Sequence, residues 1–141
     1  MKISKLDDDW KEDKTLRGDP WKYRDLSGER LGVRLEELAP GANSSEHHFH
    51  TAEEEHVIVL EGAGTLLFGT EKFPVSGGDH FWFKAGEEIA HHIQNTSKAP
   101  LKFLVFGERL SNDVVVYPEH QVIMLKSLGY KQFTYRPIKD D

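Results

Sequence analysis

The chain of 141 residues contains no cysteine, so it forms no disulfide and offers no thiolate ligand to a metal. It also lacks an apolar run long enough to cross a bilayer. Residues 1–7 lead into acidic residues and not into the apolar core of a signal peptide. We therefore expect a chain that stays in the cytoplasm without a membrane span.

Positive charge is also in short supply. Lys and Arg number 18 against 24 Asp and Glu, which gives a formal net charge of −6. No cluster of Lys and Arg offsets this balance, so we expect no nucleic-acid partner. The length is that of one domain with a substantial core.

Amphipathic helical stretches are nearly absent, and short apolar segments end at Gly or Pro instead. These segments are residues 31–38, 56–60, 65–68, 73–75, 80–83 and 101–106. Strands at such intervals are typical of a sandwich or a jelly-roll barrel, so we predict an all-β fold. Residues 122–127 alone suggest a short helical turn.

The first 19 residues differ from the rest because they are dense in charges of both signs. One interpretation is a frayed terminus, and the other is an arm that lies on a partner subunit. The apolar contacts of such an arm would be Leu6, Trp10 and Leu16. We expect the folded domain to cover residues 20–141.

Histidine and glutamate carry the chemistry of this sequence. His48 and His50 are two residues apart, so on a strand their rings face the same side. Imidazole and carboxylate are ligands of divalent transition metals. With His91 and Glu55 they would fill four positions of an octahedron and leave two open for a substrate or dioxygen.

The spacing of these residues resembles the two motifs of the cupin superfamily, and the chain is similar to small stand-alone bacterial cupins. Gly41, His48, His50, Glu55 and Gly62 resemble the first motif, and Gly78, Gly86, His91 and Asn95 resemble the second. The gaps from Gly41 to His48 and from Gly86 to His91 are longer than the family pattern, in loops that tolerate insertions. The resemblance implies a double-stranded β-helix, a jelly-roll cupin barrel, with His48, His50, Glu55 and His91 as metal ligands. The implied metal is Fe(II), Mn(II), Ni(II) or Zn(II).

Each expected ligand has a competing neighbour. His47 has the wrong parity to pair with His50, and Glu53 and Glu54 belong to an acidic run that is typical of a solvated turn. Glu55 is favoured because it shares a face with Val57 and Val59 and has the family's six-residue interval to Gly62. For His91 and His92 parity does not decide. The family's three-residue interval to Asn95 favours His91, with His92 at the rim of the pocket.

Two strands carry apolar or aromatic residues on both faces. If Glu55 faces the interior, Ile58 and Leu60 face outward, and a second sheet or a partner subunit must cover them. Cupins of this size are commonly dimers, so we expect a homodimer. In the segment 80–83 we expect all four aromatic side chains, including His80 and Trp82, to pack in the core. His56 and His120 are not expected to bind metal.

Three functions are compatible with these residues. The first is a metal-dependent enzyme, of the dioxygenase, isomerase or decarboxylase type, acting on a small oxygenated organic molecule. His92, Glu54 and Tyr117 are its candidates for proton transfer. The second is a non-catalytic module that binds a sugar or a phenolic compound beside a structural metal. The third is a cupin that has lost its activity and serves dimerisation, which an intact ligand set disfavours.

Overall fold

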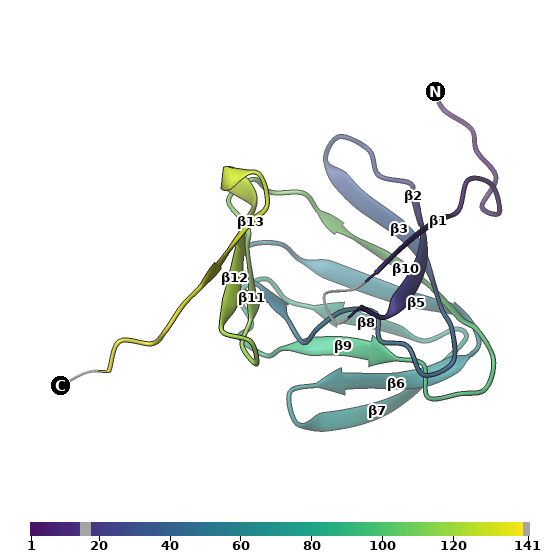
Figure 1. The fold of residues 1–141 in the computed structure, drawn as a ribbon. Helices are drawn as coiled ribbons and strands as arrows, with labels where there is room; N and C mark the ends of the chain where they lie inside the picture. The colour runs from purple at the N-terminus through teal and green to yellow at the C-terminus, as the bar shows by residue number, and fades with distance from the viewer. Residues whose placement is uncertain (15–17, 140–141) are drawn as a thin grey trace.

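The computed structural model describes residues 1–14 and 18–139, and strands supply nearly all of its regular structure (Figure 1). In chain order they are β1 (Lys11–Lys14), β2 (Pro20–Asp25), β3 (Leu31–Leu38), β4 (Phe49–His50), β5 (Glu55–Glu61), β6 (Ala63–Phe68), β7 (Glu71–Ser76), β8 (His80–Phe83), β9 (His91–Gln94), β10 (Leu101–Glu108), β11 (Val114–Tyr117), β12 (Val122–Leu125) and β13 (Lys131–Thr134). A short 3-10 helix, Lys126–Leu128, precedes β13. None of the helical residues in the described ranges forms a segment able to span a bilayer.

The strands pair antiparallel throughout and build three sheets. A six-stranded sheet has the order β1-β2-β3-β10-β5-β8, a four-stranded sheet the order β13-β12-β11-β4, and a three-stranded sheet the order β7-β6-β9. In Figure 1 the four-stranded sheet stands on the left and the three-stranded sheet lies at the bottom, both packed around an interior shared with the six-stranded sheet. This is the jelly-roll barrel that the strand spacing predicts.

The interior follows from the alternation of side chains along β5. Val57 and Val59 are 2% and 1% exposed, whereas Leu60 on the opposite face is 41% exposed. Because side chains on a strand alternate between faces, Glu55 lies on the same inner face as the two valines. The buried cluster that continues this face consists of Leu38, Ala42, Val57, Val59, Leu66, Val75, Phe83, Ile93, Leu101 and Phe103.

A close approach of two strands fixes the start of β5. Gly107 of β10 lies opposite Glu55. A Cβ atom at position 107 would overlap the backbone carbonyl oxygen of Glu54. Only glycine permits this contact between the backbones, so Gly107 sets where Glu55 enters the barrel.

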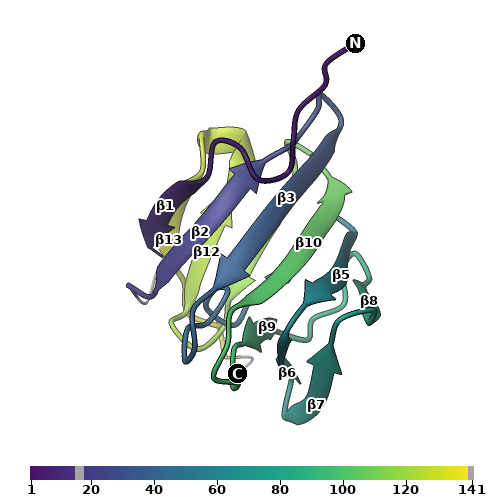
Figure 2. The ribbon, with the colours of Figure 1, turned by 90° about the vertical axis from the view of Figure 1, so that its right-hand side faces the viewer.

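The N-terminal segment lies on the outer face of the chain's own six-stranded sheet (Figure 2). Strand β1 pairs with β2, and the Arg24 guanidinium donates a hydrogen bond to the Lys5 carbonyl oxygen. Leu35, on the β3 face opposite the barrel interior, is only 1% exposed. Within the single chain the arm therefore covers its own sheet. Leu16 lies outside the described residues.

Two local expectations were wrong. His80 and Trp82 do not pack in the core: both are exposed, while Phe81 and Phe83 of the same strand face inward. Strict alternation on an edge strand gives this result, because in the described chain no further strand or helix covers the outer face there. Residues 122–127 were expected to form a helical turn, but 122–125 form strand β12, held between β11 and β13, and only 126–127 enter the 3-10 helix.

Candidate metal centre

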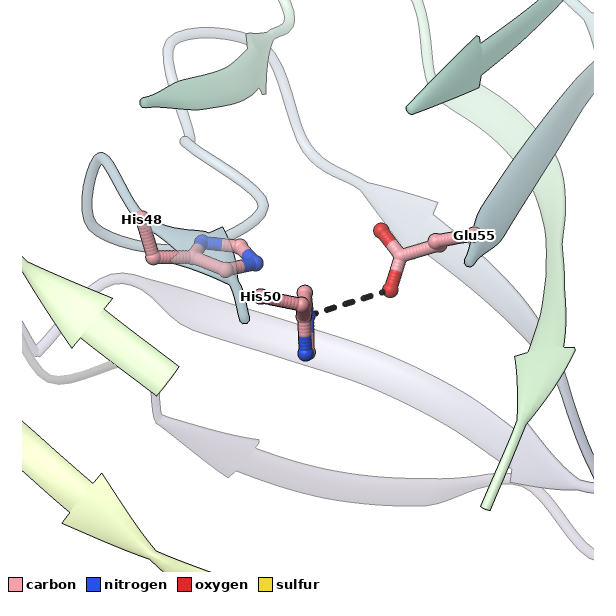
Figure 3. A group of neighbouring side chains, drawn as sticks. All are labelled: His48, His50 and Glu55. Carbon is pink, nitrogen blue, oxygen red and sulfur yellow. Dashed lines mark ion pairs between the residues drawn. The ribbon is translucent and has the colours of Figure 1, made fainter. Parts of the chain in front are cut away.

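His48, His50 and Glu55 converge on one point of the barrel interior (Figure 3). One potential ligand atom from each of the three side chains lies within 4.8 Å of the others. His50 belongs to β4, His48 precedes it, and Glu55 begins β5. The structure thus places both histidines and the glutamate as the parity argument predicts.

The Glu55 carboxylate lies between two imidazoles. Its Oε2 is 3.5 Å from Nε2 of His50, and its Oε1 is 3.8 Å from Nε2 of His91. His91 comes from β9 and bridges to His48 through the backbone. His91, the fourth expected ligand, therefore lies beside the cluster. The cluster within 4.8 Å consists of His48, His50 and Glu55.

His91 is held by stacking and not by hydrogen bonds. Its ring lies 3.5 Å from the Phe83 ring, centroid to centroid, with an interplanar angle of 3°. Both ring nitrogens are buried and have no hydrogen-bond partner among the described residues. A buried polar atom without a partner costs about 1–3 kcal/mol. A metal bound by Nε2 would satisfy the nitrogen that faces Glu55.

Hydrogen bonds at Nδ1 orient the other two imidazoles. His48 Nδ1 lies 2.8 Å from the Glu46 carbonyl oxygen, and His50 Nδ1 lies 2.7 Å from Oδ2 of Asp113. Because each oxygen accepts a hydrogen bond from Nδ1–H, each imidazole in its neutral form carries its lone pair on Nε2. This is the tautomer that a metal ligand needs.

Asp113 is a residue of the candidate site that the sequence did not reveal. Its side chain is buried, and Oδ1 accepts hydrogen bonds from the backbone amides of Ala52 and Glu53 at 3.0 and 3.1 Å. These bonds fix the carboxylate that orients His50. Asp113 stands alone in a polar loop, so nothing in the local pattern marks it.

The charges of the site are suited to binding a cation. Burial lowers the pKa of His48 to about 3, and the neighbouring His91 and His50 add to this shift. Burial would raise the pKa of Glu55, but the facing His91, His50 and His48 lower it to about 2. At neutral pH the site therefore presents a neutral imidazole and an ionised carboxylate.

His50 behaves differently from His48. Burial would lower its pKa, but the hydrogen bond to Asp113 and the charges of Glu55, Asp113 and Glu53 raise the pKa above its ordinary value. A metal that binds Nε2 of His50 therefore competes with a proton up to a higher pH than at a free imidazole.

A second acidic group lies next to the first but is already neutralised. His50, Glu53 and Asp113 also bring ligand atoms within 4.8 Å of one another. Lys126 Nζ, however, lies 2.6 Å from both Glu53 oxygens and 3.6 Å from Oδ2 of Asp113. The Lys126 ammonium takes the place that a metal cation would need. Glu53 and Asp113 therefore serve to hold His50 and not to bind a metal.

The residues next to the expected ligands in the sequence, Glu54, His47 and His92, contact other side chains. Glu54 Oε1 lies 2.7 Å from Nε2 of His56, and His47 Nδ1 lies 2.8 Å from Glu119. His92 stacks on His47 with ring centroids 4.1 Å apart. The ring of Tyr117, the third candidate for proton transfer, lies 5.8 Å from the His48 ring, centroid to centroid.

The centre opens into a cavity of about 370 Å³. This volume falls within the range of small-molecule sites. The residues that line the cavity include His48, His50, Glu55 and His91, and also Arg34, Glu36 and Tyr117. Arg34 and Glu36 were missed by sequence reasoning. The one indication was a pair of charged residues of equal parity inside the apolar segment 31–38.

Residues 34–107, more than half of the chain, match the family described as the cupin domain. The chain belongs to the cupin family. An uncharacterised protein of Methanocaldococcus jannaschii is 33% identical over 69 residues, which span 49% of this cupin and 54% of that protein. The match thus extends over about half of the curated relative's length.

Two solved structures resemble this one over most of its length. A protein from Silicibacter pomeroyi, called a sugar phosphate isomerase of the cupin superfamily, is 33% identical with a TM-score of 0.71, and the match covers 76% of this chain and 72% of that chain. A protein from Acidithiobacillus ferrooxidans, proposed to be a sugar phosphate isomerase, is 28% identical with a TM-score of 0.81, covering 92% and 88%.

Proposed function

We propose that this cupin is a metal-dependent enzyme that isomerises a small hydroxy-carbonyl compound in the barrel. The observation that carries the proposal is the convergence of His48, His50 and Glu55 within 4.8 Å beside a cavity of about 370 Å³. With His91 these residues would hold Fe(II), Mn(II), Ni(II) or Zn(II). A bound metal would supply Lewis acidity to the oxygens of the substrate. The two neighbours named for sugar phosphate isomerisation support this reaction class.

The reaction needs no external oxidant. A proton leaves the carbon beside the carbonyl group and returns to the carbonyl carbon, while a hydroxyl proton moves between the two oxygens. A side chain must carry these protons within the cavity. Burial raises the pKa of Tyr117, so its hydroxyl stays protonated and donates a hydrogen bond to a substrate oxygen. Glu54 and His92 remain candidates at the rim of the cavity, which they also border.

The decisive experiment follows carbon-bound hydrogen. Protein loaded in turn with Fe(II), Mn(II), Ni(II) and Zn(II) is incubated in D2O with aldoses, ketoses and their phosphates, and proton NMR follows deuterium at the carbon beside the carbonyl. We expect exchange with at least one metal and none in Glu55→Gln, which cannot supply the carboxylate. Tight binding without exchange or turnover across the panel would instead favour a non-catalytic sugar- or phenolic-binding module.

We further propose that the protein works in the cytoplasm as a homodimer. Ile58 and Leu60 lie on the outer face of β5, next to Leu104 and Phe106 of β10 and the exposed Trp82 of β8. These apolar side chains share the face with His56 and His80, and a second copy of the chain would bury them. Sedimentation at tens of micromolar tests the assembly, with a single monomeric species as the contrary result.

A further inference from the structure

Strand β3 directs two charged side chains into the cavity. Arg34 and Glu36 both line it, and Leu35 between them lies on the opposite face. The Glu36 side chain is 4% exposed, whereas the Arg34 side chain is 46% exposed. Glu36 therefore lies at the base of this wall, and the guanidinium extends into the open space.

Two contacts fix the guanidinium in place. Its Nε donates a hydrogen bond to Oε1 of Glu36 at 3.0 Å, and its central carbon lies 5.0 Å from the centroid of the Trp21 ring. Glu36 thus occupies one edge of the group, and Trp21 covers one face. Within residues 1–14 and 18–139, the two terminal nitrogens of Arg34 have no hydrogen-bond partner. They form a planar fork that is already oriented, the geometry that binds a carboxylate or phosphate through two bonds.

The same space contains the proposed metal ligands. Burial would lower the pKa of Arg34, but the charges of Glu36 and Glu55 raise it. The negative charge of Glu55 therefore reaches the guanidinium. The positive charge of Arg34 in turn works to lower the pKa of Tyr117, against the effect of burial. An anionic group at Arg34 would leave the rest of a small molecule between Tyr117 and the His48–His50–Glu55 centre.

The other cations that line the cavity are committed elsewhere. Lys126 Nζ is paired with Glu53 at 2.6 Å, and Arg109 donates a hydrogen bond from Nη1 to the Gly28 carbonyl oxygen at 3.0 Å. Among the described residues, Arg34 is thus the lining cation best placed to meet an anion in the interior.

We propose that Arg34, held by Glu36 and Trp21, binds the anionic group of the substrate, a phosphate or a carboxylate, while the oxygens at the substrate's other end face the metal centre. This inference rests on the proposed function and names the substrate class of the same site. Arg34 is a specificity-determining residue in this scheme, and Glu36 positions it.

Three small probes test the assignment: glycerol 3-phosphate, glycerate and glycerol, which share hydroxyl groups and differ in charge. Their dissociation constants are measured by calorimetry on the wild type and on Arg34→Gln, Arg34→Lys and Arg109→Gln, each in metal-loaded and EDTA-treated form. We expect at least one of the two anions to bind much more tightly than glycerol. The ratio of the affinities for glycerol 3-phosphate and glycerate then shows whether the site prefers phosphate or carboxylate. Arg34→Gln should weaken it roughly ten- to a hundredfold. Arg34→Lys should be intermediate, because an ammonium offers no fork, and Arg109→Gln should match the wild type.

Metal content and thermal unfolding of each variant separate this proposal from the metal proposal. Arg34→Gln should keep its metal and its melting temperature while losing the anion. Equal anion affinity in Arg34→Gln and the wild type would overturn the assignment, and so would glycerol binding as tightly as both anions. Loss of metal by the wild type would count against the enzyme alone, because the Arg34-dependent anion affinity of the EDTA-treated protein is a separate measurement.

Discussion

The Nδ1 atom of His50 lies 2.7 Å from Oδ2 of Asp113, a residue 63 positions further along the chain. The bond joins the loop before β11 to β4, the strand that carries His50. Asp113 orients the His50 imidazole and also raises its pKa. A proton therefore competes more strongly with a metal for Nε2 of His50. The strength of metal binding therefore depends on pH through His50.

We predict that metal affinity rises with pH between about 6 and 8, with release of close to one proton per metal. Because the pKa of His50 is raised, the metal-free site keeps this proton to a higher pH than a free imidazole would, and binding requires the neutral ring. Asp113→Asn should lower the pKa of His50 and move the transition to lower pH. Calorimetry in buffers of different ionisation enthalpy measures the released protons, and an affinity independent of pH across this range would contradict the prediction.

A second prediction separates the proposed ligands from their neighbours. Glu55→Gln and His91→Ala should remove most of the metal, whereas Glu54→Gln and His92→Ala should leave about one metal per chain. Glu55 faces His50 and His91, while Glu54 bonds to His56 and His92 stacks on His47. Elemental analysis of untagged protein gives the stoichiometry. Retention of metal by Glu55→Gln together with loss by Glu54→Gln would place the register one residue off.

The stability of the metal-free protein should depend on His48. Its folded-state pKa is about 3, against an ordinary value of 6.5, so the folded chain binds the proton more weakly than the unfolded chain. The stabilisation is present above about pH 6.5 and is lost as the pH falls toward 3, on the order of a few kcal/mol. His48→Gln should therefore flatten the rise of unfolding free energy over this interval. Urea titrations in EDTA at several pH values compare the slopes, and identical slopes for the two proteins would refute the assignment.

Gly107→Ala should impair metal binding from outside the site. A Cβ atom there would overlap the Glu54 carbonyl oxygen, so β10 and the start of β5 must move apart and carry Glu55 with them. We expect a loss of about 1–3 kcal/mol in stability and a weaker metal affinity. Gly28→Ala is the matched control, because nothing lies within 4 Å of its added Cβ atom. Equal metal affinity in the two variants would mean that Gly107 does not position Glu55.

Removal of residues 1–14 should destabilise the fold without releasing the metal. The deletion breaks the β1–β2 pairing and the Lys5–Arg24 hydrogen bond. Each hydrogen bond lost costs about 0.5–1.5 kcal/mol. Deletion of residues 1–4 is the control, since it keeps both contacts. Thermal unfolding and metal analysis are compared, with sedimentation to report whether the dimer also weakens, as an arm on the partner would require.

The sequence identified the parts of the site that are encoded by short spacing. The two-residue interval of His48 and His50 and the shared parity of Glu55, Val57 and Val59 correctly predicted which side chains face inward. Those relations depend only on the pleat of a strand.

Other features depend on contacts between distant segments. The roles of Asp113 and Lys126 require β4 to pair with β11 and the 3-10 helix to approach Glu53, which no local pattern specifies. The aromatic segment 80–83 was misjudged for a related reason. Whether His80 and Trp82 are covered depends on β8 being the edge of its sheet, a property of the topology and not of the segment.

The proposed ligands and the proposed anion-binding wall occupy separate strands. The ligands belong to β4, β5 and β9 and the residue before β4, whereas Arg34 and Glu36 belong to β3 and Tyr117 ends β11. A substitution at Arg34 or Glu36 therefore leaves the proposed metal ligands intact. Single substitutions could change which molecule is bound without producing a variant that no longer binds the metal. A library varied at positions 34 and 36 would test this separation directly, because it changes the proposed anion contact and leaves both the ligands and Tyr117 in place.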